Sequence, residues 1–229
     1  MWIKSSLTSL LTLCLMNSLA QADLAKGLEA VEKGHWQTAL AEFKPLANRG
    51  DPNAQVDLGN LYMRGLGVEQ DYGIAYEWYA KAAHQGHATG QNKLALMLYY
   101  GLGVKENHTE AASWFLKAAE QGDPAAAMVV AELYDKGDGV PGSKINAYVW
   151  FSIAADLGKE DALNQRETLA NQLSPNDLNN ALTRLSVWRG QQEKMQPGSA
   201  NGHEENSVAG KKAGTGSPPR STKGKSAGR

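Results

Sequence analysis

The sequence predicts an all-α protein: an α/α solenoid (superhelix) of antiparallel helix pairs with a repeat of 36 residues. Three tryptophans set this period, and glycines recur on it. The aligned residues are Trp78, Trp114 and Trp150; Gly65, Gly101 and Gly137; and Gly86, Gly122 and Gly158. A period between about 20 and 50 residues is typical of solenoids, in which each unit buries its apolar face only against its neighbours.

Each of the three blocks, 51–86, 87–122 and 123–158, is predicted to form two helices joined by a turn. Apolar residues in the first block follow helical spacing, and Gly65 supplies the left-handed backbone that ends the first helix. The second helices are expected to begin after a residue type that caps helix N-termini. These capping residues are Asp71, Asn107 and Ser143.

The flanking segments extend the predicted stack. Residues 23–50 are predicted to form a looser helix pair, and residues 159–194 a partial repeat followed by a capping helix. Ser174 is the expected N-cap of that last helix, with Pro175 at the first helical position and Asp177 at the third. Such a helix would cover the open end of the solenoid.

The first 22 residues have the pattern of a cleaved secretory signal peptide. Lys4 provides a positive charge, a leucine-rich stretch follows, and Ala20-Gln21-Ala22 fits a cleavage site. An uncleaved anchor is the alternative, but the stretch is shorter than the ~20 residues needed to span a bilayer. The mature protein is therefore expected to be periplasmic or secreted, with no transmembrane segment. It would contain no cysteine, because Cys14 lies in this segment.

Charge divides the mature chain into an acidic body and a basic tail. Residues 23–194 hold 16 basic and 22 acidic side chains, whereas residues 195–229 hold 6 and 2. The tail is rich in Gly, Ser, Pro and Lys and is predicted to be disordered, because it cannot bury enough apolar surface to offset its ordering entropy. It could bind an anionic envelope polymer or membrane surface. A solvated tail without function is the alternative.

The recurring residues resemble the Sel-one-like repeat (SLR), a relative of the tetratricopeptide repeat (TPR). The family pattern, roughly A-x3-LG-x-LY-x2-G-x-GV followed by A-x2-W-[YF]-x2-AA-x2-G, is nearly complete in residues 54–86. Residues 23–50 are TPR-like. Gly90, where alanine is usual, and Pro141 depart from the pattern. The resemblance implies a superhelix with a concave face that holds a protein or peptide partner.

In TPR-type stacks, the exposed side of the first helices lines the concave groove. The corresponding residues here are candidates for partner binding, and three of them, Leu96, Tyr99 and Tyr100, could form an apolar spot flanked by charges. The full set is Asp57, Asn60, Arg64, Lys93, Leu96, Tyr99, Tyr100, Glu132 and Lys136.

No catalytic, cofactor-binding or metal-binding residue is predicted. His84 and His87 are spaced like half of a zinc site but have no third clustered ligand. His84 is expected to interact with the C-terminal end of its helix, and His35 and His108 are interpreted as isolated turn residues. The tryptophans are interpreted as core residues rather than as platforms for a sugar or base.

The predicted function is a non-enzymatic scaffold for protein or peptide interaction, acting as an adaptor or regulator in the bacterial envelope. An alternative is an enzyme of the cysteine-rich repeat type that binds and hydrolyses β-lactams. Members of that type carry a cysteine pair in each repeat, which the mature chain lacks. The other alternative is attachment to an envelope polymer through the tail, and an exported protein is not expected to bind nucleic acid.

Overall fold

The computed structural model describes residues 21–195, and all regular structure in that range is helical. A first helix runs to residue 32, and nine helices follow it. They are α2 (Trp36–Asn48), α3 (Pro52–Arg64), α4 (Tyr72–His84), α5 (Ala88–Tyr100), α6 (His108–Glu120), α7 (Pro124–Lys136), α8 (Lys144–Asp156), α9 (Asp161–Ala170) and α10 (Pro175–Met195). The predicted signal peptide and basic tail lie almost wholly outside the described residues.

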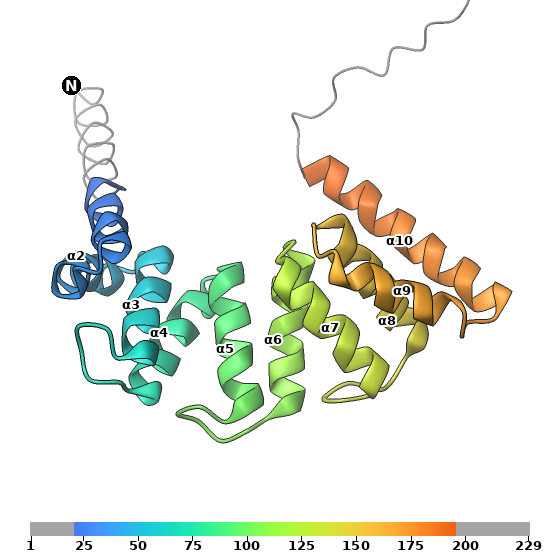
Figure 1. Cartoon of the computed structure of the whole chain (residues 1–229), viewed down its shortest axis with the longest axis horizontal. Coiled ribbons are helices and arrows are strands. Elements are labelled where there is room, and N and C mark those ends of the chain that lie inside the picture. Colours follow the sequence, from blue (N-terminus) through green and yellow to red (C-terminus); the bar gives the residue numbers. More distant parts are fainter. Residues whose placement is uncertain (1–20, 196–229) are drawn as a thin grey trace, which may run out of the picture.

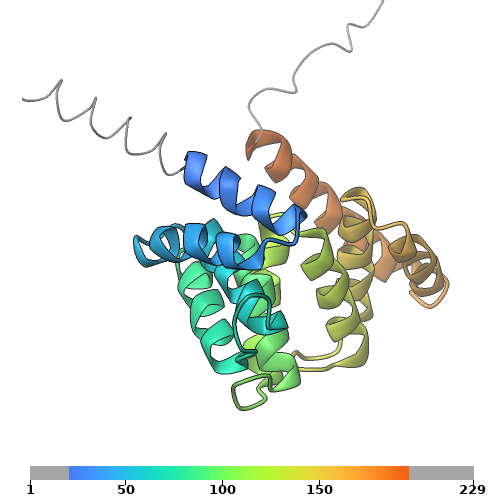
Figure 2. The same ribbon diagram turned by 60° about the vertical axis from the view of Figure 1, so that its left-hand side comes forward.

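Consecutive helices from α2 to α9 pack against each other and form a curved row (Figure 1). The N-terminal helix (residues 21–32) and α10 lie on the same side of that row in two views (Figure 2). The first helices α3 and α5 also contact each other directly, as expected for helices on the inner side of a curve. We call the exposed side of α3, α5 and α7 the first-helix face. Within residues 21–195, no helix is both long and apolar enough to cross a membrane.

The turn inside each repeat uses two glycines for different purposes. Gly65, Gly101 and Gly137 end the first helices with φ values of 65°, 64° and 70°, as the sequence predicts. The second glycine lies against the first residue of the preceding second helix. A Cβ placed on Gly103 would lie 2.4 Å from the Tyr72 carbonyl carbon, and one on Gly139 would lie 2.3 Å from the His108 carbonyl oxygen. Successive repeats are therefore joined by backbone contact.

Capping side chains fix where the helices begin. The expected caps of the second helices are confirmed: Asp71 accepts a hydrogen bond from the Ile74 amide at 2.9 Å, and Asn107 and Ser143 act in the same way. The first helices α3 and α7 have aspartate at this place, Asp51 and Asp123. The same position in α5 is held by His87, a cap that the sequence analysis did not identify.

The aromatic residue after each tryptophan forms the centre of the core. Tyr79, Phe115 and Phe151 are buried, whereas Trp114 is only just buried and Trp78 and Trp150 are half-buried. Lys81 lies over the Trp78 ring at 3.8 Å, and Lys117 lies over Trp114 at 3.9 Å. The interpretation of the tryptophans as core residues is therefore correct only in part, since they pack at its edge. For the first two, a lysine lies over the ring.

Two buried glutamines link neighbouring repeats. The Gln55 amide donates to the Ala47 carbonyl at 3.2 Å, and its oxygen accepts from Gln85 at 2.7 Å. Gln91 makes the same pair of bonds one repeat later, with the Ala83 carbonyl and Gln121. These bonds satisfy polar groups that would otherwise be costly to bury.

The C-terminal helix departs from the alternating pattern. α9 packs on α8, but α10 also packs mainly on α8 rather than on α9. Two hydrogen bonds, 2.7 and 2.9 Å long, join the Arg189 guanidinium to the Asp156 carboxylate, and Arg184 donates to Asn146 at 2.7 Å. The expected Ser174 cap is present, with its hydroxyl oxygen 3.2 Å from the Asp177 amide. α10 therefore crosses the last complete repeat.

Candidate interaction surface

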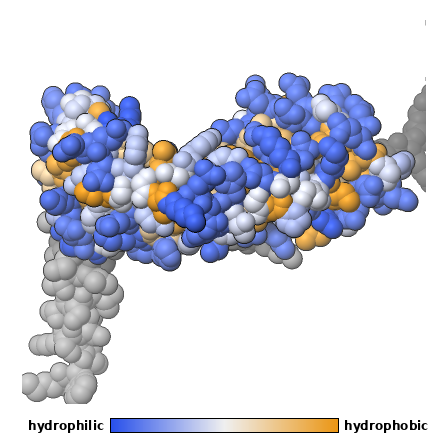
Figure 3. Space-filling view, turned by 90° about the horizontal axis from the view of Figure 1, so that it is seen from below, coloured by the Kyte–Doolittle hydropathy of each residue, from blue (hydrophilic) through white to orange (hydrophobic). Residues whose placement is uncertain are grey.

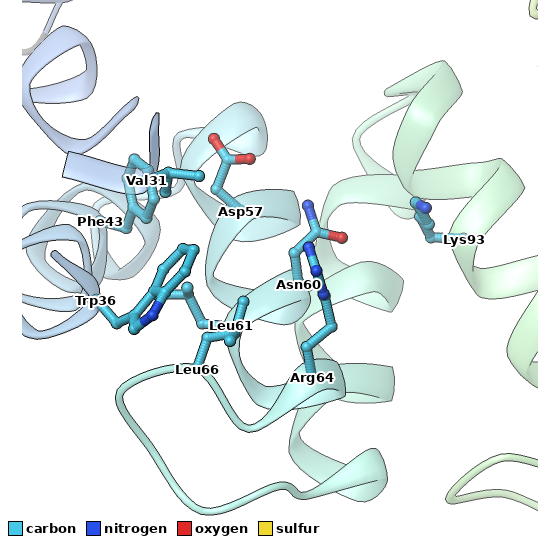
Figure 4. A pocket seen from close by; sticks show the side chains of 9 residues that line it. All are labelled: Val31, Trp36, Phe43, Asp57, Asn60, Leu61, Arg64, Leu66 and Lys93. Carbon is cyan, nitrogen blue, oxygen red and sulfur yellow. The ribbon is translucent and has the colours of Figure 1, made fainter. Parts of the chain in front are cut away.

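A pocket of about 300 Å³ opens where the N-terminal helix pair meets the first repeat (Figure 4). One end is apolar and is formed by side chains from the N-terminal helix (residues 21–32), α2, α3 and the turn after α3. The other end is polar and is formed by α3 and α5. The lining residues are Val31, Trp36, Phe43, Leu61 and Leu66 at the apolar end and Asp57, Asn60, Arg64 and Lys93 at the polar end. Four of the nine predicted partner-binding residues thus line one pocket.

The polar residues of α3 that line the pocket have a defined hydrogen-bond arrangement. Tyr79 donates its phenolic proton to Asn60 Oδ1 at 2.8 Å, so the Asn60 amide nitrogen is left to interact with Asp57. Burial raises the pKa of Asp57 to about 6, and hydrogen bonding to Asn60 offsets part of that shift. Burial also raises the pKa of Tyr79, with a smaller contribution from the nearby Asp57 charge. The Asp57 carboxyl in the pocket therefore stays protonated to a higher pH than an exposed aspartate does.

The charged residues of the face differ between repeats. Among the described residues, Lys136 pairs with Glu132 one helical turn earlier, at 3.2 Å. Arg64 occupies the same repeat position as Lys136, but the residue one turn before it is Asn60, and no ion pair is formed by Arg64 or Lys93 within the described chain. The cations at the pocket are thus available to a partner, whereas Lys136 is already neutralised.

The predicted apolar spot divides into three different environments. Leu96 is half-buried and packs against the main core, while the Tyr100 side chain is 63% exposed. The rings of Tyr99 and Tyr100 meet edge to face with centroids 5.1 Å apart. Tyr100 is the member of this group that is most open to a partner.

Tyr99 belongs to a cluster that joins the second and third repeats. Its hydroxyl donates to Asp138 at 2.7 Å, and its ring stacks on His108 with centroids 4.4 Å apart. His108 Nδ1 lies 2.5 Å from the second Asp138 oxygen, and Nε2 lies 3.0 Å from Glu106. The interpretation of His108 as an isolated turn residue is wrong: it is the first residue of α6, and the neighbouring repeat supplies its carboxylate partner.

Ionisation of this cluster follows from its contacts. The hydrogen bond to Asp138 raises the pKa of Tyr99 to about 12 and is also the main cause of a raised pKa at His108. The hydrogen bonds from Tyr99 and His108 lower the pKa of Asp138. These contacts therefore stabilise the ionised form of Asp138, the neutral form of Tyr99 and the protonated form of His108.

The histidine pair considered for zinc has other partners. His84 Nδ1 lies 2.7 Å from the Ala80 carbonyl, in the last turn of α4 as expected, and its ring meets Trp114 edge to face. His87 Nδ1 accepts from the Gly90 amide at 3.2 Å, and its Nε2 lies 3.0 Å from Asn53 Oδ1. Within residues 21–195 there is no group of three or more side chains that could hold a metal ion.

The side of the molecule seen in Figure 3 is mainly hydrophilic, with apolar residues in small, separate areas.

The apolar end of the pocket was not identified from the sequence. The available signal was positional: Trp36 stands 36 residues before Tyr72, and Leu66 stands 36 residues before Leu102. Extending the period backward into the looser N-terminal pair would have placed Trp36 beside the turn that contains Leu66.

The Sel1 repeat model matches residues 52–87, 88–123 and 124–159. A Sel1 repeat protein from Oxalobacter formigenes is 34% identical, with a TM-score of 0.60, over 62% of this chain and 58% of the other. A protective antigen from uropathogenic Escherichia coli that displays an SLR fold is 31% identical, with a TM-score of 0.63, over 76% of this chain and 38% of the other. No curated protein is significantly similar to this chain.

These matches and the helical arrangement define an α/α solenoid of Sel1 repeats. The chain belongs to the Sel1-repeat family. It spans about three fifths of the length of the first similar structure and about two fifths of the second. Proteins of this family are generally scaffolds for protein interaction, and the fold is typically non-enzymatic.

Proposed function

We propose that this chain is an exported scaffold that binds a protein or peptide partner on its first-helix face and acts as an adaptor or regulator in the bacterial envelope. The observation that carries the proposal is the position of the polar end of the pocket and of the exposed Tyr100 ring, which both lie on the first helices α3 and α5. On the second helices, in contrast, the rings of Trp78 and Trp114 lie under their own lysines. Tyrosine and arginine side chains are enriched at protein interfaces and among the residues that contribute most to binding.

A site-specific photocrosslinker tests the working surface. It would replace Tyr100 in the full-length chain expressed in bacterial cells, and the matched control would carry it at Ser113, an exposed residue of the second helix α6. We expect one dominant protein adduct from Tyr100 that is absent from the Ser113 variant. Equal adduct patterns at the two positions would argue against recognition by the first-helix face.

Export is proposed from residues 1–22, which lie almost wholly outside the described structure. N-terminal sequencing of the protein recovered from the periplasm or medium should give Asp23 as the first residue. Recovery of the intact N-terminus from the cytoplasm would contradict export.

The tail offers a second route to the envelope, supported by the opposite net charges of residues 23–194 and 195–229. Deleting residues 196–229 should then release the protein from envelope fractions at low salt, because attraction between exposed charges is screened by salt. Unchanged retention would exclude this role.

A further inference from the structure

The strongest unassigned feature is the combination of an apolar cavity with uncompensated positive charge at one junction. The pocket volume of about 300 Å³ is at the lower end of the range of about 300–1,000 Å³ for small-ligand sites. It suits one large side chain rather than an extended ligand. Trp36, Val31 and Leu66 are half-buried and supply apolar surface that such a side chain would cover.

The electrostatics of the polar end favour an anion. Arg64 and Lys93 line the pocket from α3 and α5 and form no ion pair within the described residues. The one carboxyl in the lining, Asp57, is half-buried, and burial is the main cause of its raised pKa, with a smaller contribution from the nearby Asp51 charge. Asn60 is held by Tyr79 and carries no charge. Because the two cations outnumber the single acid, the pocket has a net positive charge at neutral pH.

The corresponding position two repeats later lacks this property. Lys136 lies at the position of Arg64, but Glu132 replaces Asn60 and neutralises it at 3.2 Å. The cations without an ion pair therefore lie beside the apolar cavity, with Arg64 from the first repeat and Lys93 from the second. Figure 4 shows that Arg64 and Asn60 follow one side of α3 and that Lys93 comes from the neighbouring helix, so the charged part of the pocket faces the next repeat.

We propose that this pocket binds an acidic segment of a partner protein, with one large apolar side chain between Val31, Trp36 and Leu66 and an adjacent side-chain carboxylate beside Arg64 and Lys93. This assignment rests on the proposed function and names the chemistry of its partner. The segment continues along the first-helix face toward Tyr100, because the open polar end of the pocket includes a residue of α5. Recognition therefore combines apolar burial with charge pairing.

Three capped peptides test the proposal with the full chain. Each is acetylated and amidated, so that side chains carry its only charges, and each has the core Phe-Asp-Glu, Phe-Asn-Gln or Phe-Lys-Lys between Gly-Ser spacers. Binding is followed at the Trp36 indole N–H by NMR, with the resonance assigned through Trp36→Phe. We expect the acidic peptide to shift this resonance and to bind at least tenfold more tightly than the neutral peptide.

Matched variants identify the groups responsible. Arg64→Gln combined with Lys93→Gln should weaken binding of the acidic peptide at least tenfold, whereas Lys81→Gln combined with Lys117→Gln should leave it unchanged, because this control removes the same charge from exposed positions of the second helices α4 and α6. Asp57→Asn should preserve or strengthen binding. Thermal unfolding of each variant establishes that it is folded.

Several outcomes would overturn the assignment: equal binding of the acidic and neutral peptides, tighter binding of the basic peptide, or loss of binding in Asp57→Asn. If Tyr100 still captures one partner in cells while the peptides fail at Trp36, the scaffold function stands and the pocket assignment is wrong. If the peptides bind at Trp36 while Tyr100 and Ser113 give equal adducts, the pocket assignment stands and the wider first-helix face is wrong.

Discussion

Two junctions of the solenoid share one backbone contact but differ in the side chains around it. The first junction joins the N-terminal helix pair to the first repeat, and the last joins the second repeat to the third. At the first, Gly67 lies against Trp36, and Leu66 and Trp36 line an open pocket. At the last, Gly139 lies against His108, and Asp138 binds His108 and Tyr99. The corresponding residues at the middle junction are Tyr72 and Leu102.

This difference shows which positions hold the same residue in every repeat of this chain and which positions differ. The glycine column fixes how closely successive repeats approach each other, because a side chain there would collide with backbone. The neighbouring column holds Leu66, Leu102 and Asp138 and is free to change, since those residues lie beside the contact rather than inside it. A pocket and a polar cluster are thus two uses of the same site in the repeat.

The largest effect is expected from breaking the shared backbone contact. Gly139→Ala would force a φ of 69° on alanine and place its Cβ 2.3 Å from the His108 carbonyl oxygen. We expect a loss of about 3 kcal/mol or more in the free energy of unfolding, from left-handed strain of about 1–2 kcal/mol plus the cost of moving backbone. Urea unfolding monitored by circular dichroism measures it.

Two matched variants sharpen this prediction. Gly67→Ala should cost somewhat less, because the nearest atom of Trp36 is 2.9 Å away. Gly86→Ala has a similar φ of 84° but no atom within 4 Å, so only the strain of about 1 kcal/mol remains. Equal losses at Gly139 and Gly86 would mean that the close approach does not join the repeats.

The sequence predicted the fold because the residues that recur every 36 positions are those that pack or cap. Gly65, Tyr79 and Asp71 behave as their columns indicate, and the helix boundaries follow from them. The pocket was only half predicted, since Trp36 belongs to a looser pair whose pattern does not match the repeat. The contact between His108 and Asp138 was missed because each differs in type from the residues at the equivalent positions of the other repeats. The repeat pattern therefore gives no signal that these two side chains, 30 positions apart, meet.

The second-largest effect is expected at Asp57, whose pKa shift is opposite in direction to that of Asp138. Burial raises the pKa of Asp57 from 3.8 to about 6, so the folded state binds its proton more tightly than the unfolded state does. Asp57 therefore favours folding below about pH 4, and this advantage is lost as the pH rises through 6. Asp57→Asn should then stabilise the protein at pH 7.5 by about 1–2 kcal/mol after allowance for partial exposure, with little change at pH 4.

Asp138→Asn is the control of opposite sign. Its hydrogen bonds lower the pKa of Asp138, so its carboxylate contributes stability above about pH 4 that is lost as the pH falls through the folded value. Removing the charge should therefore destabilise the protein at pH 7.5, by about 1 kcal/mol or less because solvent partly screens this half-buried site. Chemical unfolding at both pH values compares the two variants. The same sign for both at pH 7.5 would remove the distinction between the junctions.

The smallest effect concerns protonation of the His108 imidazole. Hydrogen bonding to Asp138 is the main cause of its raised pKa, and Glu106 contributes less. The charged ring adds stability that is fully present below the unfolded pKa of about 6.5 and is lost as the pH rises through the folded value. Both partners are thus charged between about pH 4 and 6.5, where the cluster is strongest. NMR titration of the ring should show its pKa falling in Asp138→Asn.

Glu106→Gln separates contact between repeats from contact within the turn. Glu106 and His108 belong to the same turn and helix start, whereas Asp138 comes from the next repeat. If the cluster joins two repeats, Asp138→Asn must lower the His108 pKa more than Glu106→Gln does. A larger shift in Glu106→Gln would mean that the ring is held by its own repeat. The last junction would then depend on the Gly139 backbone contact and on the hydrogen bond from Tyr99 to Asp138.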